Sequence, residues 1–132
     1  MLPGDASLKP LRWPQAWLLL WWSLVGLVVT LSLIPGDTVP PLPVMGGDKL
    51  EHCAAYAALA ATAVQLFTRN AVLRAGAGLV ALGIGLELGQ YLFTSSRQMD
   101  VFDALANALG VAAGLSTGWT PWRDLLVQRF PR

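Results

Sequence analysis

The chain of 132 residues contains little charge and a single cysteine. Charged residues make up 13% of the sequence and hydrophobic residues 55%, whereas a soluble domain typically carries about 25% charged residues. A chain this short has a large surface for its volume, so in water it would need more polar covering. We therefore exclude a soluble globular enzyme and a disordered chain, and we expect membrane lipid to be the main solvent. The net charge of +1 gives no basic field for nucleic acid, so we expect no nucleic-acid partner.

The sequence predicts four hydrophobic helices of membrane-spanning length, which requires about 20 mostly apolar residues. The stretches are 16–34, 49–67, 75–93 and 101–119. The first lacks an A-x-A-like cleavage site after it, so we expect it to be retained rather than removed as a signal peptide. Short connections make successive helices antiparallel neighbours. The predicted fold is thus all-α: a polytopic membrane protein with one domain, 1–132, of four antiparallel transmembrane helices.

The remaining segment, 122–130, is predicted to be either a short amphipathic helix in the membrane surface or a basic tail. Positive charges predict the orientation of the bundle. With both termini in the cytoplasm, the positive-inside rule is obeyed, and we expect a multi-pass membrane protein in this orientation. The cytoplasmic side then holds Lys9, Arg12, Arg69, Arg74, Arg123, Arg129 and Arg132, and the opposite side holds Lys49 and Arg97.

Polar residues of the last three helices gather at their outer ends, in stripes with helical spacing. A charge in hydrocarbon costs about 2.5–3.5 kcal/mol, so the stripes should face one another rather than lipid. We therefore predict an outward-facing polar site. Its expected ligand-binding residues are Lys49, His52 and Tyr56 on one helix, Glu87 and Gln90 on the next, Arg97 in the loop, and Asp103 and Asn107 on the last helix.

Small residues repeat every four positions in the last two helices, which lets helix backbones approach closely in lipid. We expect close packing along both stripes. They are Ala77, Ala81, Gly85 and Gly89, and then Ala106, Gly110, Gly114 and Gly118.

The segment DKLEHCAAY, residues 48–56, resembles the D-K-x-x-H-x-x-x-Y signature of VanZ-like membrane proteins. The later series, Glu87-x-x-Gln90, Arg97, Asp103-x-x-x-Asn107-x-x-Gly110, is similar to that family's E-x-x-Q, R, D-x-x-x-N-x-x-G series. The resemblance covers about half of the chain. It implies a small multi-helix protein of the bacterial envelope, and the family's founding member is associated with resistance to the glycopeptide antibiotic teicoplanin.

Structural roles compete with functional ones at several of these positions. Asp48 and Asp100 each precede a helix and can act as N-caps, and Lys49 can extend to lipid phosphates. Glu87 lies inside an apolar segment, so it should pair with Arg97, Lys49 or His52, or else be desolvated.

Four functions remain open on the sequence. The leading one is the binding of a polar or anionic head group from an envelope lipid or a glycopeptide-like molecule. The second is an enzyme acting on a lipid-linked phosphate or ester, with His52, Glu87 and Asp103 as the catalytic candidates. A proton-coupled transporter and an assembly subunit are the others, and a homo-oligomer is an open option. His52 with several acids could hold a divalent metal, but no H-E-x-x-H or similar spacing occurs, so we predict neither metal nor cofactor.

Overall fold

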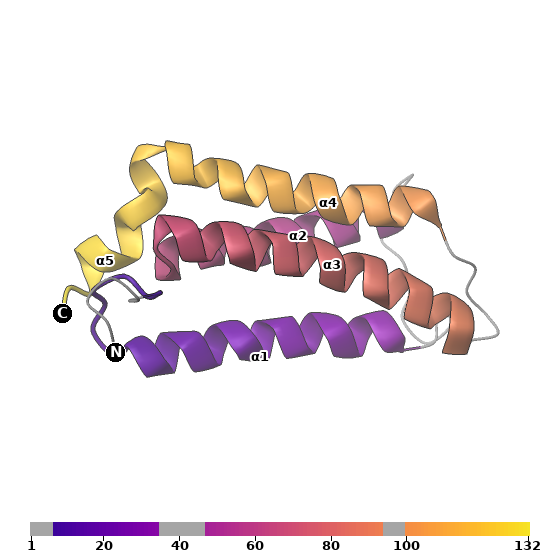
Figure 1. Cartoon of the computed structure of the whole chain (residues 1–132), viewed down its shortest axis with the longest axis horizontal. Helices are drawn as coiled ribbons and strands as arrows, with labels where there is room; N and C mark the ends of the chain where they lie inside the picture. The colour runs from indigo at the N-terminus through magenta and orange to yellow at the C-terminus, as the bar shows by residue number, and fades with distance from the viewer. Residues whose placement is uncertain (1–6, 35–46, 94–99) are drawn as a thin grey trace.

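The computed structural model describes residues 7–34, 47–93 and 100–132, without the side chains of residues 47 and 48. Figure 1 shows the long helices lying side by side, with successive helices running in opposite directions and both termini at one end. The described part of the chain is helical, apart from two isolated bridges near the termini. The elements are α1 (Pro14–Leu33), α2 (Gly47–Leu66), α3 (Arg69–Phe93), α4 (Val101–Ser116), the 3-10 turns η1 (Thr117–Trp119) and η2 (Pro121–Asp124), and α5 (Leu125–Arg129).

Within the described residues, three helical stretches are long and apolar enough to cross a membrane: α1, α3, and the continuous stretch from Val101 to Trp119. The prediction of an all-helical protein is confirmed, and these three stretches are candidate membrane-spanning helices. The predicted fourth crossing, 49–67, forms the helix α2, but α2 is not among these three. Its first turns carry Asp48, Lys49, Glu51 and His52, which lower its hydropathy.

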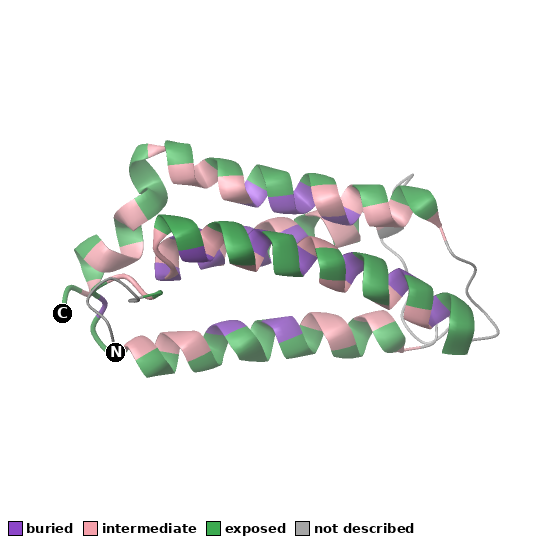
Figure 2. Ribbon diagram, viewed as in Figure 1, coloured by how far each residue is buried: buried purple, intermediate pink, exposed green. Residues whose placement is uncertain are grey.

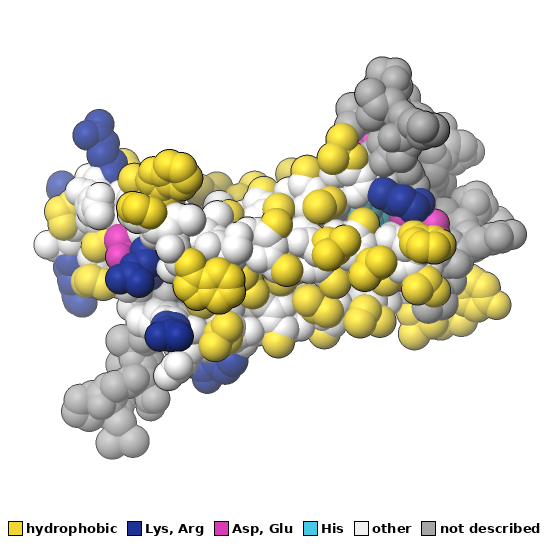
Figure 3. Space-filling model, turned by 90° about the horizontal axis from the view of Figure 1, so that it is seen from above, with side chains coloured by type: hydrophobic (Ala, Val, Ile, Leu, Met, Phe, Trp, Pro, Cys, Tyr) yellow, Lys and Arg dark blue, Asp and Glu magenta, His cyan; other side chains and the backbone are white. Residues whose placement is uncertain are grey.

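The outer faces of the helices are apolar. Large hydrophobic side chains such as Leu19, Leu27, Ile84 and Leu109 are more than half exposed. In Figure 3, hydrophobic side chains cover the flank between the two ends, and Lys and Arg side chains gather mainly at one end. An apolar flank between polar ends is the surface expected for helices in lipid.

The buried side chains lie on the inward faces of the helices (Figure 2). From α1, Trp21 enters the core and its Nε1 donates a hydrogen bond of 3.0 Å to the backbone oxygen of Leu59 in α2. The same indole contacts the ring of Phe67 edge-on. Since an indole N–H inside an apolar core needs an acceptor, this bond fixes how α1 rests on α2.

Helices α2 and α4 have their backbones in direct contact at two glycines. A Cβ at Gly110 would lie 2.3 Å from the backbone oxygen of Cys53, and one at Gly114 would lie 2.4 Å from that of Ala57. Both distances are too short for any side chain. The predicted close packing is therefore confirmed at these two positions of α4.

The corresponding prediction for α3 is wrong. Ala77 and Ala81 are exposed, and a Cβ at Gly85 or Gly89 would meet nothing within 4 Å. The tight approaches of α3 involve different glycines. A Cβ at Gly76 would meet Leu115 at 2.7 Å, and one at Gly83 would meet Asn107 at 3.1 Å.

Six of the eight predicted boundaries lie within two residues of those observed, but α3 begins at Arg69 rather than at 75. Arg69 and Asn70 are exposed, and they continue the helix beyond its apolar part. Hydropathy marks the part of a helix that is suited to lipid, whereas the hydrogen-bonded backbone can extend past it. The stretch 101–119 likewise changes to a 3-10 turn at Thr117.

The end of the molecule that holds both termini is joined by side-chain bonds. Lys9 Nζ donates to the backbone oxygens of Val64 and Arg123, at 2.6 and 2.7 Å, and lies 2.9 Å from Asp124 Oδ1. Gln65 accepts from the backbone N–H of Leu126 and donates to the carbonyl of Trp122. The C-terminal segment is thus fastened to α2, and α5 itself is only five residues long.

Candidate functional site

The polar residues predicted to form a site do converge at the far end of the bundle from the termini. Seven of the eight predicted residues lie on the expected helices: three in the first half of α2, two near the end of α3 and two in the first half of α4. Arg97 lies outside the described residues. We use the name polar cluster for the five side chains that contact one another across the three helices: Lys49, His52, Glu87, Asp103 and Asn107.

His52 lies at the centre of the polar cluster. Its Nδ1 is 3.0 Å from Asn107 Oδ1 and 3.9 Å from Glu87 Oε1. An amide oxygen can only accept, so a hydrogen bond to Asn107 Oδ1 requires the proton on Nδ1. The imidazole thus lies between an amide on α4 and a carboxylate on α3.

Lys49 joins α2 to the start of α4. Its Nζ lies 3.1 Å from Asp100 Oδ2 and 3.3 Å from Asp103 Oδ1, and its side chain is 40% exposed. Asp100 is also the N-cap of α4, since its carboxylate accepts the N–H of Phe102 at 2.8 Å. The hydrogen bond from Lys49, and then the one from Phe102, hold the pKa of Asp100 below its ordinary value. The capping role predicted for Asp100 is therefore confirmed, together with an ion pair.

Glu87 is the most deeply buried acid among the side chains that the structure describes, with 2% of its surface exposed. Among the described residues, its Oε2 has no hydrogen-bond partner. Asp103 Oδ1 is buried as well, and although Lys49 lies within ion-pair distance it forms no hydrogen bond to this oxygen. Leaving a buried polar atom without a hydrogen bond costs about 1–3 kcal/mol, and more when the group is charged.

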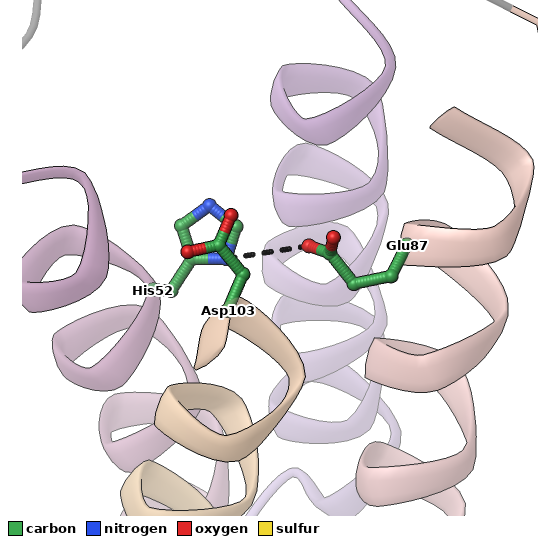
Figure 4. A group of neighbouring side chains, drawn as sticks. All are labelled: His52, Glu87 and Asp103. Carbon is green, nitrogen blue, oxygen red and sulfur yellow. Dashed lines mark ion pairs between the residues drawn. The ribbon is translucent and has the colours of Figure 1, made fainter. Parts of the chain in front are cut away.

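Figure 4 shows the side chains of His52, Glu87 and Asp103 pointing toward one another from α2, α3 and α4. One ligand-type atom from each of them lies within 4.8 Å of the other two. Like-charged carboxylates disfavour each other at this separation, and a cation or a proton between them relieves that repulsion.

The other two predicted residues support the polar cluster from its edges. Gln90 is buried, and its Nε2 donates to the backbone oxygen of Ser32 in α1. Tyr56 is buried beside Gly83, where a Cβ would meet both its ring and the amide of Asn107. Gln90 therefore joins α3 to α1, and Tyr56 packs beneath Asn107.

Sequence reasoning missed Gly83 as a site residue. It lies four positions before Glu87 and so on the same face of α3, and its missing side chain gives Asn107 and Tyr56 their space. The i, i+4 spacing to the buried acid was the signal that could have identified it.

No protein-family model, curated protein or solved structure matches this chain.

Proposed function

We propose that this chain is a small multi-pass protein of the bacterial cytoplasmic membrane, and that its polar cluster binds a polar or anionic head group at the outer face. In this proposal α2 is a fourth crossing and both termini are cytoplasmic. The chain would then be a VanZ-like protein, and its ligand would be an envelope lipid or a glycopeptide-like molecule, with a link to teicoplanin tolerance.

The direction of the polar side chains of α2 supports a fourth crossing. Lys49 contacts acids at the start of α4, and His52 contacts Asn107. Two of the groups that make α2 too polar by composition are therefore turned toward protein rather than toward lipid. The same inward direction is expected of polar residues inside a bundle in hydrocarbon.

The charge distribution supports the orientation. Lys9 and Arg123 lie at the end that holds both termini, together with the C-terminal segment. Lys49 lies at the opposite end with Asp100. A basic end and a mixed-charge end are typical of cytoplasmic and outer faces, respectively.

The buried carboxylate of Glu87, which points into the polar cluster from α3, is the observation that carries the binding proposal. Ionisable residues among apolar helices are costly and usually functional. Lys49, with its partly exposed ammonium, would meet the anionic part of the head group. His52 and Asn107 would donate or accept hydrogen bonds.

The experiment is native mass spectrometry of the full chain purified in mild detergent. We expect a bound envelope lipid on the wild type, loss of that mass in Glu87→Gln and Asp103→Asn, and its retention in Glu51→Gln. Glu51 is the matched control because it is an exposed acid on α2. Titration with teicoplanin tests the glycopeptide ligand separately. Equal bound mass in all four proteins would contradict a shared site.

A lipid-linked phosphate or ester hydrolase is the second candidate, favoured by the 3.9 Å approach of His52 Nδ1 to Glu87 Oε1. A histidine next to a carboxylate can transfer protons between a water molecule and a leaving group. Release of phosphate or fatty acid from envelope lipids by the purified protein, abolished in His52→Ala, would favour this candidate over binding alone.

A further inference from the structure

Three metal-ligating side chains meet in the polar cluster, each from a different helix. His52 comes from α2, Glu87 from α3 and Asp103 from α4, and one donor atom of each lies within 4.8 Å of the other two (Figure 4). We propose that these three residues bind one divalent transition-metal ion, with Zn²⁺ and Mn²⁺ as the best matches. This site goes beyond the proposed function and does not depend on it.

A second observation points to a ligand inside this group. Glu87 Oε2 and Asp103 Oδ1 are both buried and both without a hydrogen-bond partner among the described residues. Buried polar atoms are almost always satisfied, and each exception requires an explanation. A cation between the helices would satisfy both oxygens at once and would balance the two negative charges.

His52 faces the carboxylate of Glu87 through Nδ1, which lies 3.9 Å from Glu87 Oε1 (Figure 4). The same nitrogen lies 3.0 Å from Asn107 Oδ1. To bind a cation, Nδ1 must present its lone pair, which requires the tautomer that carries its proton on Nε2. Asn107 can stay next to the ring in that state, because its amide group offers N–H donors as well as an oxygen acceptor.

The types of ligand atom at the site indicate which class of metal ion would bind. One imidazole nitrogen and two carboxylates suit Zn²⁺ or Mn²⁺, whereas Ca²⁺ and Mg²⁺ prefer oxygen ligands alone. With bonds of about 2.0–2.2 Å, the ligand atoms of a tetrahedral Zn²⁺ site lie roughly 3.4 Å apart. The donor atoms, which lie within 4.8 Å of one another, must therefore approach by up to about 1.4 Å. Three protein ligands leave a position for water or for an anionic group.

Lys49 provides a test of whether a cation binds at this site. Its ammonium lies 3.3 Å from Asp103 Oδ1, so it competes with a cation for that carboxylate. Removing its charge should strengthen cation binding, whereas a purely structural ion pair would give no cation binding to strengthen.

The experiment uses the full chain in detergent, with any affinity tag removed and bound metals stripped by a chelator. Calorimetric titration with Zn²⁺ and with Mn²⁺ should give one ion per chain. Glu87→Gln, Asp103→Asn and His52→Gln should each weaken binding at least about tenfold. Glu51→Gln should bind like the wild type, and Lys49→Gln should bind severalfold more tightly.

Co²⁺ absorption spectra supply a second measurement, and the spectrum of the wild type does not depend on the stability of any variant. Tetrahedral N/O coordination should give visible d–d bands in the wild type, and these bands should weaken in Asp103→Asn. The absence of saturable Zn²⁺ and Mn²⁺ binding in the wild type would overturn the proposal, as would unchanged affinity in Glu87→Gln. Lipid binding is measured separately, with excess chelator present. A failure of metal binding can then be distinguished from a failure of the proposed lipid binding.

Discussion

Replacing Gly110 by alanine should push α2 and α4 apart at the point where the two backbones touch. The new Cβ would lie 2.3 Å from the oxygen of Cys53 and 3.0 Å from its carbonyl carbon. Both obstructing atoms belong to the backbone, so no side-chain rotation can relieve the clash. Ordinary contact begins at 3.4 Å, so the helices must separate locally by about 1 Å.

The size of the effect follows from two opposing contributions. Forcing one extra methyl group into a packed interface costs about 1–3 kcal/mol, and more where only backbone can yield. Alanine in place of glycine in a helix gains about 1 kcal/mol. We expect a net loss of about 2 kcal/mol in the free energy of unfolding.

Gly85→Ala is the matched control because a Cβ there would meet nothing within 4 Å. It keeps the gain in helix propensity without the clash, so it should be as stable as the wild type or more stable by up to about 1 kcal/mol. Unfolding of both variants in mixed detergent micelles, followed by circular dichroism, measures the difference. Equal stabilities for Gly110→Ala and Gly85→Ala would refute the account of the α2–α4 contact.

Two further predictions concern the ends of the bundle. The hydrogen bond from Lys49 holds the pKa of Asp100 in the folded protein below its unfolded value of 3.8. The ionised carboxylate therefore stabilises the fold above pH 3.8. This stabilisation is lost as the pH falls through the lower pKa of the folded state. Stability measured from pH 6 down to about 2 should therefore fall less steeply in Asp100→Asn, and parallel curves would contradict the ion pair. Gln65→Leu should speed hydrogen exchange at the amide of Leu126 and leave α3 unaffected, because it removes the bonds to Trp122 and Leu126; unchanged exchange would mean that α5 is held by other contacts.

Helical spacing predicted that polar residues of α2, α3 and α4 meet, but it predicted neither that Gln90 bonds to α1 nor which atoms pair. Lys49 and His52 fall on one stripe of α2, and Asp103 and Asn107 on one stripe of α4, so their facing each other followed from the cost of exposing them to lipid. The individual partners depend on the axial offset between helices. Hydropathy does not fix that offset to within one turn, and Glu87 accordingly had several candidate partners. The structure places His52 Nδ1 3.9 Å from Glu87 Oε1, while Arg97 lies outside the described residues.

The packing face of α3 was predicted wrongly for a physical reason. Small residues occur on more than one face of this helix, and lipid accommodates a glycine as readily as a neighbouring helix does. A stripe such as Ala81 and Gly85 therefore does not identify the buried face. The buried Glu87 does, because its carboxylate must face protein. Counting back from it by four residues leads to Gly83, one of the two glycines of α3 that are tightly packed.

The same contacts determine which part of the polar cluster can move. At Gly110 the backbones of α2 and α4 already leave no room for a methyl group, so His52 and Asp103 are held at a separation that cannot shrink through helix movement. Glu87 comes from α3, which packs less extensively on α4 than α2 does. Any tightening around a ligand or a cation must therefore come from the Glu87 side chain or from the outer end of α3. A substitution that loosens the α2–α4 contact should for this reason weaken binding without touching a binding residue, because it spreads apart the pair of helices that presents two of the three converging side chains.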